Sequence, residues 1–135
     1  MLFKTSNIFF LSLFMKKTLV IGASENPLRY GNKAVRLLQE FDHDIVALGQ
    51  KKGIINGTPI ITEWSEIPTD IHTITLYLRP QLQDEVFIQR VLSITPVRII
   101  FNPGTENSKF FNDALSRNIE TIEACTLVML RLGSY

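Results

Sequence analysis

Short apolar runs alternate along this chain with longer segments of helical periodicity. The runs are rich in Ile, Val, Leu and Thr, and most end close to glycine or proline. Such runs are typical of strands buried on both faces of a sheet. Strands that alternate with helices pair in parallel, so we expect an α/β, Rossmann-like doubly wound fold: a five-stranded, mostly parallel sheet with helices on both faces. The five runs are Thr18–Ile21, Ile45–Leu48, His72–Leu78, Val97–Phe101 and Ile119–Ile122.

The segments between these runs carry apolar residues at helical spacing. They predict one helix after residue 31, one that begins at Pro80, one around Phe110 and one over Thr126–Leu132, while Trp64–Ile67 indicates a single helical turn. Asn56-Gly57 lies between two apolar pairs, which is typical of a tight β-hairpin turn. The apolar positions that predict the first three helices are Ala34, Leu38, Phe41, Leu82, Val86, Phe87, Val91, Ile94, Phe110, Phe111, Ala114 and Leu115.

The composition is that of an ordinary packed domain. The chain has 135 residues, 45% of them hydrophobic, and a formal charge of +1. A near-neutral balance supplies no extended positive field, so nucleic acid is not expected as a partner. No apolar run approaches the roughly 20 residues that span a bilayer, so no membrane association is expected. The single cysteine allows no internal disulfide, which favours a reducing compartment such as the cytoplasm.

Residues 1–14 differ from the rest of the chain. They hold one lysine followed by an apolar stretch, and no small-residue cleavage site separates them from the first predicted strand. We therefore interpret residues 1–14 as an N-terminal extension from a start assigned too early, with Met15 as the working initiator. A secretory signal and a membrane-surface helix are the alternatives. The domain itself is predicted over residues 15–135.

The loop over residues 22–31 is the most informative one for function. In an open parallel sheet, ligands bind beyond the carboxyl ends of the strands, where the strand order reverses. Gly22, Ala23 and Ser24 let the backbone approach a ligand closely, and free N–H groups at the next helix attract phosphate, helped by Arg29. The spacing differs from Gly-x-Gly-x-x-Gly, so the motif does not indicate a nicotinamide dinucleotide. A tight strand-to-helix turn without a ligand is the alternative.

Two lysines follow the second predicted strand, where an NAD site usually carries Asp or Glu. Lys51 and Lys52 suit a ribose that carries phosphate, as in NADP or in the 3′-phosphoadenosine of coenzyme A. The alternative is a pair of solvated lysines in a hairpin loop.

Further candidates follow the other strands. Arg79 is placed to reach a pyrophosphate bidentately, whereas Tyr77 is either a core residue or a ligand contact. The segment from Asn102 to Asn107 is interpreted as a sharp turn that caps the next helix. Cys125 is expected to be a packed thiol, with a reactive thiol at a helix start as the alternative. No triad, carboxylate pair or metal-ligand spacing can be placed, so we predict no catalytic and no metal-binding residues.

Five segments in order along the chain carry a family resemblance: Thr18–Ser24, Tyr30–Asn32, Ile74–Pro80, Ile100–Asn107 and Glu123–Leu130. Together they resemble the small CoA-binding domain proteins, single-domain relatives of the N-terminal domain of the succinyl-CoA synthetase α subunit. The resemblance implies a Rossmann-type domain that binds coenzyme A, with the end of the second strand facing the adenosine part. The residues that it assigns to the site are Gly22, Ala23 and Ser24 at the phosphates, Tyr30 and Gly31 completing that loop, and Tyr77, Leu78, Arg79 and Pro80 lining the groove.

The resulting hypothesis is a stand-alone coenzyme A-binding module without catalytic activity of its own, which acts as a carrier, sensor or partner subunit. An NADP-dependent oxidoreductase or redox-sensing nucleotide-binding domain is the first alternative, and a structural subunit with an empty groove is the second. The expected ligand is a small-molecule nucleotide, and both a homodimer and a complex with a partner subunit stay open.

Overall fold

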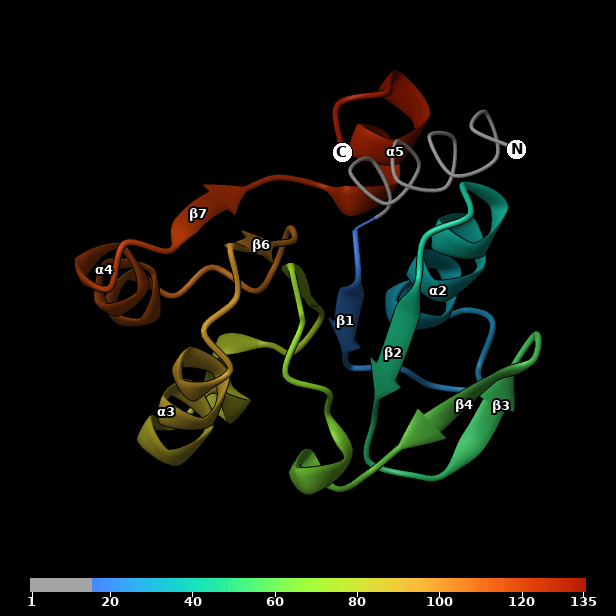
Figure 1. Cartoon of the computed structure of the whole chain (residues 1–135), viewed down its shortest axis with the longest axis horizontal. Helices are drawn as coiled ribbons and strands as arrows, with labels where there is room; N and C mark the ends of the chain where they lie inside the picture. The colour runs from blue at the N-terminus through green and yellow to red at the C-terminus, as the bar shows by residue number, and fades with distance from the viewer. Residues whose placement is uncertain (1–15) are drawn as a thin grey trace, which may run out of the picture.

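The computed structural model describes residues 16–135 (Figure 1). The interpretation of residues 1–14 as an extension lies outside the described residues. The strands are β1 (Thr18–Ile21), β2 (Ile45–Leu48), β3 (Gly53–Ile55), β4 (Thr58–Ile61), β5 (Thr73–Leu76), β6 (Arg98–Phe101) and β7 (Glu120–Glu123). The helices are α2 (Tyr30–Glu40), α3 (Glu85–Ser93), α4 (Ser108–Ser116) and α5 (Thr126–Leu132), with short 3₁₀ turns η1 (Trp64–Glu66) and η2 (Pro80–Leu82).

All seven strands form one sheet in the order β3-β4-β2-β1-β5-β6-β7. Every pair is parallel except β3 with β4, so the predicted doubly wound α/β class is confirmed. The predicted count of five strands is wrong. The Asn56-Gly57 turn, with positive φ at both residues, folds β3 back on β4, and β4 pairs in parallel with β2 through Ala47 and Ile60. The hairpin thus extends the sheet, because pairing satisfies backbone groups that β2 would otherwise leave open.

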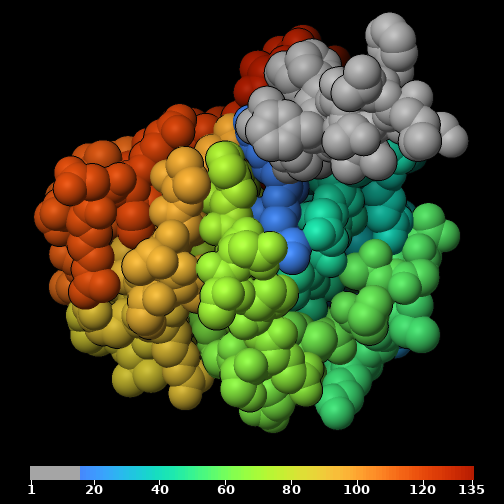
Figure 2. Space-filling model, in the orientation of Figure 1, coloured from blue at the N-terminus to red at the C-terminus, as the bar shows by residue number. Residues whose placement is uncertain are grey.

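Helices cover both faces of the sheet, and each face has its own core (Figure 1). On one face α2 and α5 pack together over β1 and β2, with Val35, Leu38 and Leu127 buried. On the other face α3 and α4 contribute Leu92 and Phe110 to a larger core. Figure 2 shows the hairpin and α4 at opposite ends of a closely filled body.

The segment after Pro80 differs from its predicted single helix. Pro80–Leu82 forms only a 3₁₀ turn, and α3 begins at Glu85 after Asp84, whose side chain accepts from the Phe87 N–H at 2.9 Å. The break rotates the helix face, so Leu82 and Val86, predicted to be buried, are exposed. Phe41, which directly follows α2, and Leu115 of α4 were also expected on apolar helix faces and are exposed.

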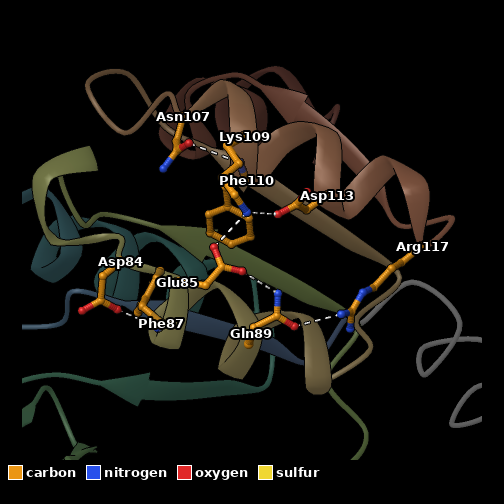
Figure 3. A network of polar contacts seen from close by, with 9 residues as sticks. All are labelled: Asp84, Glu85, Phe87, Gln89, Asn107, Lys109, Phe110, Asp113 and Arg117. Carbon is orange, nitrogen blue, oxygen red and sulfur yellow. Dashed lines mark hydrogen bonds and ion pairs between the residues drawn. The ribbon is translucent and has the colours of Figure 1, made fainter.

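A network of polar contacts ties α3 to α4 on the outside of the molecule (Figure 3). The Lys109 ammonium lies 2.8 Å from Glu85 of α3 and 2.7 Å from Asp113 of α4. Arg117 donates to Gln89 at 2.9 Å. Since these groups are exposed, the network contributes little free energy, but it joins the two helices whose N-terminal loops lie at the carboxyl ends of β5 and β6.

Two further findings concern residues 16–135 alone. None of the helices there is long and apolar enough to cross a bilayer. No group of three or more His, Cys, Asp and Glu side chains in this range is arranged to hold a metal ion.

Candidate functional site

In the described part of the chain, six loops leave the carboxyl edge of the sheet, because the strands that precede them run parallel. They follow β1, β2, β4, β5, β6 and β7, and the strand order reverses between β1 and β5. In doubly wound sheets a crevice at this reversal binds the ligand. All residues that the sequence analysis placed in a site lie in these loops or at the start of α2.

Glycines bring three backbone segments of this edge into close contact. A Cβ atom on Gly31 would lie 2.1 Å from the Gly22 oxygen, and one on Gly49 would lie 2.3 Å from the Ala23 oxygen. Gly22 itself has φ +102°, and a Cβ there would come within 2.8 Å of the Tyr77 oxygen. The start of α2 therefore packs directly on the loop after β1, which in turn packs on the loops after β2 and β5.

The backbone amides of the first loop are partly used within the fold. The N–H groups of Gly22 and Ala23 both donate to the Leu48 carbonyl at 3.0 Å. Asn32, fully buried, donates to the Ser24 carbonyl at 2.8 Å and so holds the loop against α2. Within the described part of the chain, the amides of Ser24 and Glu25 in this loop make no hydrogen bond, nor do those of Tyr30, Gly31 and Asn32 in the first turn of α2, as expected at a helix N-terminus. The predicted phosphate contact stays a prediction, and these amides are its available donors.

The four cations predicted to assist binding are all solvent-exposed at this edge: Arg29, Lys51, Lys52 and Arg79. Among residues 16–135, none of them forms an ion pair. Their charges therefore remain available to an anionic ligand.

Glu25 is an organising residue that sequence reasoning missed. Its carboxylate accepts from the Ile54 N–H at 3.1 Å and lies against Gly53, where a Cβ would come within 2.4 Å of the Glu25 side chain. It thereby ties the loop after β1 to the edge strand β3, just beyond the lysine pair. No local signal in the sequence announces this contact, because it depends on where the hairpin packs.

Asn102 joins three elements at the carboxyl edge. It is 1% exposed, donates to the Thr75 hydroxyl at 2.7 Å and to the Leu76 carbonyl at 2.9 Å, and accepts from the Thr126 N–H at 2.9 Å. The capping of α4 expected from the segment Asn102 to Asn107 is provided by Asn107, whose side chain accepts from the Phe110 N–H. Asn102 thus fixes the first turn of α5 against β5 and β6.

Gln83 performs a similar task between the loops after β5 and β6. It is 5% exposed and donates to the carbonyls of Leu78 at 2.7 Å and Thr105 at 2.9 Å. Sequence reasoning missed it, since a glutamine after a 3₁₀ turn carries no distinctive pattern.

A cavity of about 220 Å³ opens at this edge, lined by Tyr30, Tyr77, Asn102, Pro103 and Cys125. Tyr77 packs against the α2–α5 core, which was one of its two predicted roles, and it also lines the cavity, while the contact with a ligand stays a prediction. Its buried hydroxyl has no hydrogen-bond partner among the described residues, and burial raises the Tyr77 pKa well above its ordinary value. Cys125 is half-buried and precedes α5.

The opposite, amino edge of the sheet carries the two histidines. The backbone N–H of Lys16 donates to His43 Nδ1 at 3.3 Å, and His72 Nδ1 lies 2.8 Å from the Thr73 hydroxyl. Burial lowers the pKa of both imidazoles, and the positive charges of Lys16 and Arg98 lower it further. The histidines are thus remote from the candidate site and bear on stability.

Comparison with known proteins identifies the family. Residues 16–131 match the family model described as a CoA binding domain. The chain belongs to the CoA-binding domain family. The resemblance noted in the sequence is thereby confirmed over nearly all of the described residues of this CoA-binding domain.

Solved structures of similar proteins agree with the fold of this CoA-binding domain. An uncharacterized protein is 40% identical with a TM-score of 0.83, and the match covers 90% of this chain and 98% of that one. A hypothetical protein from Pyrococcus horikoshii OT3 is 22% identical, with a TM-score of 0.78 and coverage of 94% and 90%. A Thermus thermophilus protein at 16% identity has a TM-score of 0.79 and coverage of 97% and 98%. No curated protein matches the chain.

Proposed function

We propose that this chain is a stand-alone coenzyme A-binding module without catalytic activity of its own, which serves as a carrier, sensor or partner subunit. The observation that carries the proposal is the match of residues 16–131 to the CoA-binding domain family. The carboxyl edge supports it, because it combines a glycine cradle, free helix amides and unpaired cations. These are the groups that a polyanionic nucleotide requires.

The proposed contacts follow the order of the strands. The amides at the start of α2, with Arg29, would receive the pyrophosphate, while Lys51 and Lys52 beyond β2 would receive the 3′-phosphate of the ribose. Tyr77 to Pro80 after β5 would line the groove beside the adenosine part. Gly22, Ala23 and Ser24 keep the predicted role of shaping the loop at the phosphates.

The absence of catalytic activity is proposed from the lining of the cavity. Its five residues include one cysteine and two tyrosines, but no carboxylate, histidine or lysine that would activate them by proton transfer. A partner subunit would therefore have to supply any such group.

One observation also favours NADP. The Lys51–Lys52 pair would bind the 2′-phosphate of NADP as readily as the 3′-phosphate of coenzyme A. NADP is therefore the competing ligand, and it would make the chain an NADP-dependent oxidoreductase or a redox-sensing nucleotide-binding domain.

Titration calorimetry with coenzyme A, dephospho-coenzyme A, NADPH and NADH distinguishes them. We expect coenzyme A to bind most tightly and dephospho-coenzyme A more weakly, since the latter leaves the lysines without their phosphate. Tighter binding of NADPH than of coenzyme A would contradict the proposal. Absence of heat with all four ligands would indicate a structural subunit with an empty groove.

A further inference from the structure

The cavity of about 220 Å³ lies on a different part of the carboxyl edge from the lysine pair. Along the sheet the order is β2, β1, β5, β6, β7. Lys51 and Lys52 follow β2, whereas the cavity is lined by residues that follow β5, β6 and β7, with Tyr30 closing it from α2. The strands that lead into the cavity are two to four strand spacings from β2, at roughly 4.8 Å for each spacing.

The lining of the cavity is uncharged. Two tyrosines, a proline, an asparagine and a cysteine form its walls. The Asn102 side chain is already occupied, because both its amide nitrogen and its oxygen bond to the fold. The Tyr77 hydroxyl is the buried polar side-chain atom of this lining that has no hydrogen-bond partner among the described residues. A tyrosine hydroxyl is protonated near neutral pH, and burial raises the Tyr77 pKa further, so this group is a hydrogen-bond donor.

An uncharged hollow next to a cationic phosphate site fits a ligand with one polyanionic and one neutral end. Coenzyme A is such a ligand, because its nucleotide carries the phosphates and its pantetheine arm ends in a neutral thiol or thioester. With the 3′-phosphate at the end of β2 and the pyrophosphate at the start of α2, the arm would extend along the groove past Tyr77 toward the loops after β6 and β7.

We propose that this cavity receives the thiol end of the coenzyme, and that its size restricts the cargo to the free thiol or a short acyl group. This inference rests on the coenzyme A-binding function proposed above. The cavity is smaller than the roughly 300–1,000 Å³ of typical ligand pockets, so a chain of many carbons would have to leave it or displace Tyr30. The half-buried Cys125 thiol would then be covered by the bound arm.

Alkylation of Cys125 tests the first part directly, because it is the only cysteine in the chain. Its rate of reaction is measured by intact mass with iodoacetamide in large excess over all thiols, because coenzyme A carries a thiol of its own. The protein is compared free and with saturating coenzyme A, acetyl-coenzyme A or adenosine 3′-phosphate 5′-diphosphate, which lacks the pantetheine arm. We expect both thiol-bearing and acetylated coenzyme to slow the reaction about tenfold or more, since only free protein reacts. The fragment should bind without slowing it.

The outcomes separate the two proposals. Failure of coenzyme A and of the fragment to bind in calorimetry would overturn the proposed function itself. Binding of coenzyme A with an unchanged alkylation rate would overturn only the placement of its thiol end. Equal protection by the armless fragment would do the same, because the nucleotide would then cover Cys125.

A pair of variants tests the size limit. Tyr30→Ala removes one wall of the cavity, and Leu28→Ala truncates an exposed apolar side chain two residues earlier that does not line it. We expect the wild type and Leu28→Ala to bind octanoyl-coenzyme A several-fold more weakly than acetyl-coenzyme A, and Tyr30→Ala to reduce that difference. Equal affinity of the wild type for both thioesters would contradict the limit.

Discussion

Gly31 packs so closely on Gly22 that a Cβ atom at residue 31 would lie 2.1 Å from the Gly22 carbonyl oxygen. This contact sets where α2 begins, and with it the position of the three free amides of its first turn at the switch point of the sheet. The Tyr30-Gly31 pair therefore has two roles. Gly31 allows α2 to approach the end of β1, and Tyr30 beside it lines the cavity of about 220 Å³.

Gly31→Ala is expected to destabilise the fold by about 3 kcal/mol, the upper range for overpacking, because the obstructing atom belongs to the backbone. Chemical denaturation measures the loss. Gly57→Ala is the control, since that glycine has positive φ with nothing within 4 Å of an added Cβ. It should cost about 1 kcal/mol through backbone strain alone. Equal losses in the two variants would show that the contact with Gly22 relaxes.

Replacing Lys51 and Lys52 with glutamate should weaken coenzyme A binding by about 1–3 kcal/mol, because charge-assisted hydrogen bonds to phosphate are lost. Calorimetry measures the effect, and the loss should be smaller for dephospho-coenzyme A. Arg131→Glu, a charge reversal at an exposed residue of α5, is the control for the general change in charge. If the lysine variant binds coenzyme A as the wild type does, the assignment of the 3′-phosphate to these lysines is wrong.

Asn102→Ala should lower the free energy of unfolding by about 1–3 kcal/mol, because the buried Thr126 N–H and Leu76 carbonyl lose their hydrogen bonds to the Asn102 side chain. It should also speed alkylation of Cys125, because α5 loses its anchor at that end. Asn107→Ala is matched to it: the same residue type in the same loop, but serving only as a helix cap. That variant should cost about 1 kcal/mol and leave Cys125 unchanged. Identical alkylation rates in both variants would contradict the anchoring role.

Phe110→Ala should cost about 3–5 kcal/mol, because this fully buried ring packs edge-on against Phe101 at 5.0 Å between centroids. Thermal and chemical unfolding measure the loss. The neighbouring Lys109→Gln breaks two ion pairs of the network in Figure 3, yet its groups are exposed and the unfolding midpoint should hardly move. A large effect of Lys109→Gln would show that the surface network contributes more than solvent screening allows.

Stability should fall as the pH drops below about 6.5, the ordinary histidine pKa. His43 and His72 have lowered pKa values in the folded state, first through burial and then through Lys16 and Arg98, with Asp42 or Glu120 opposing weakly. The unfolded chain therefore takes up protons before the folded one, and the melting temperature declines between 6.5 and the lowered pKa values. Replacing both histidines with glutamine should flatten that decline. A melting temperature that rises on acidification through this range would contradict the prediction.

Several features of this protein could be predicted from the sequence alone, because they depend on neighbouring residues. The strands β1 and β2 and the helix α5 occupy the predicted residues, and the Asn56-Gly57 turn forms as expected. Apolar periodicity and turn-forming residues act over a few positions, so they can be recognised in the sequence without knowledge of the fold. The segments that resemble CoA-binding domains are local in the same sense, and the family match bears them out.

Only the tertiary structure decided how distant segments meet. Asn102 bonds to Thr126, 24 residues away, and Glu25 bonds to Ile54, 29 residues away. The hairpin became part of the sheet because β2 had a free edge, and the helix predicted from Pro80 started later because Asp84 offered a better cap. These outcomes depend on which buried polar groups find partners and which backbones approach without a clash. That competition is settled between elements, so no single stretch of the sequence encodes it.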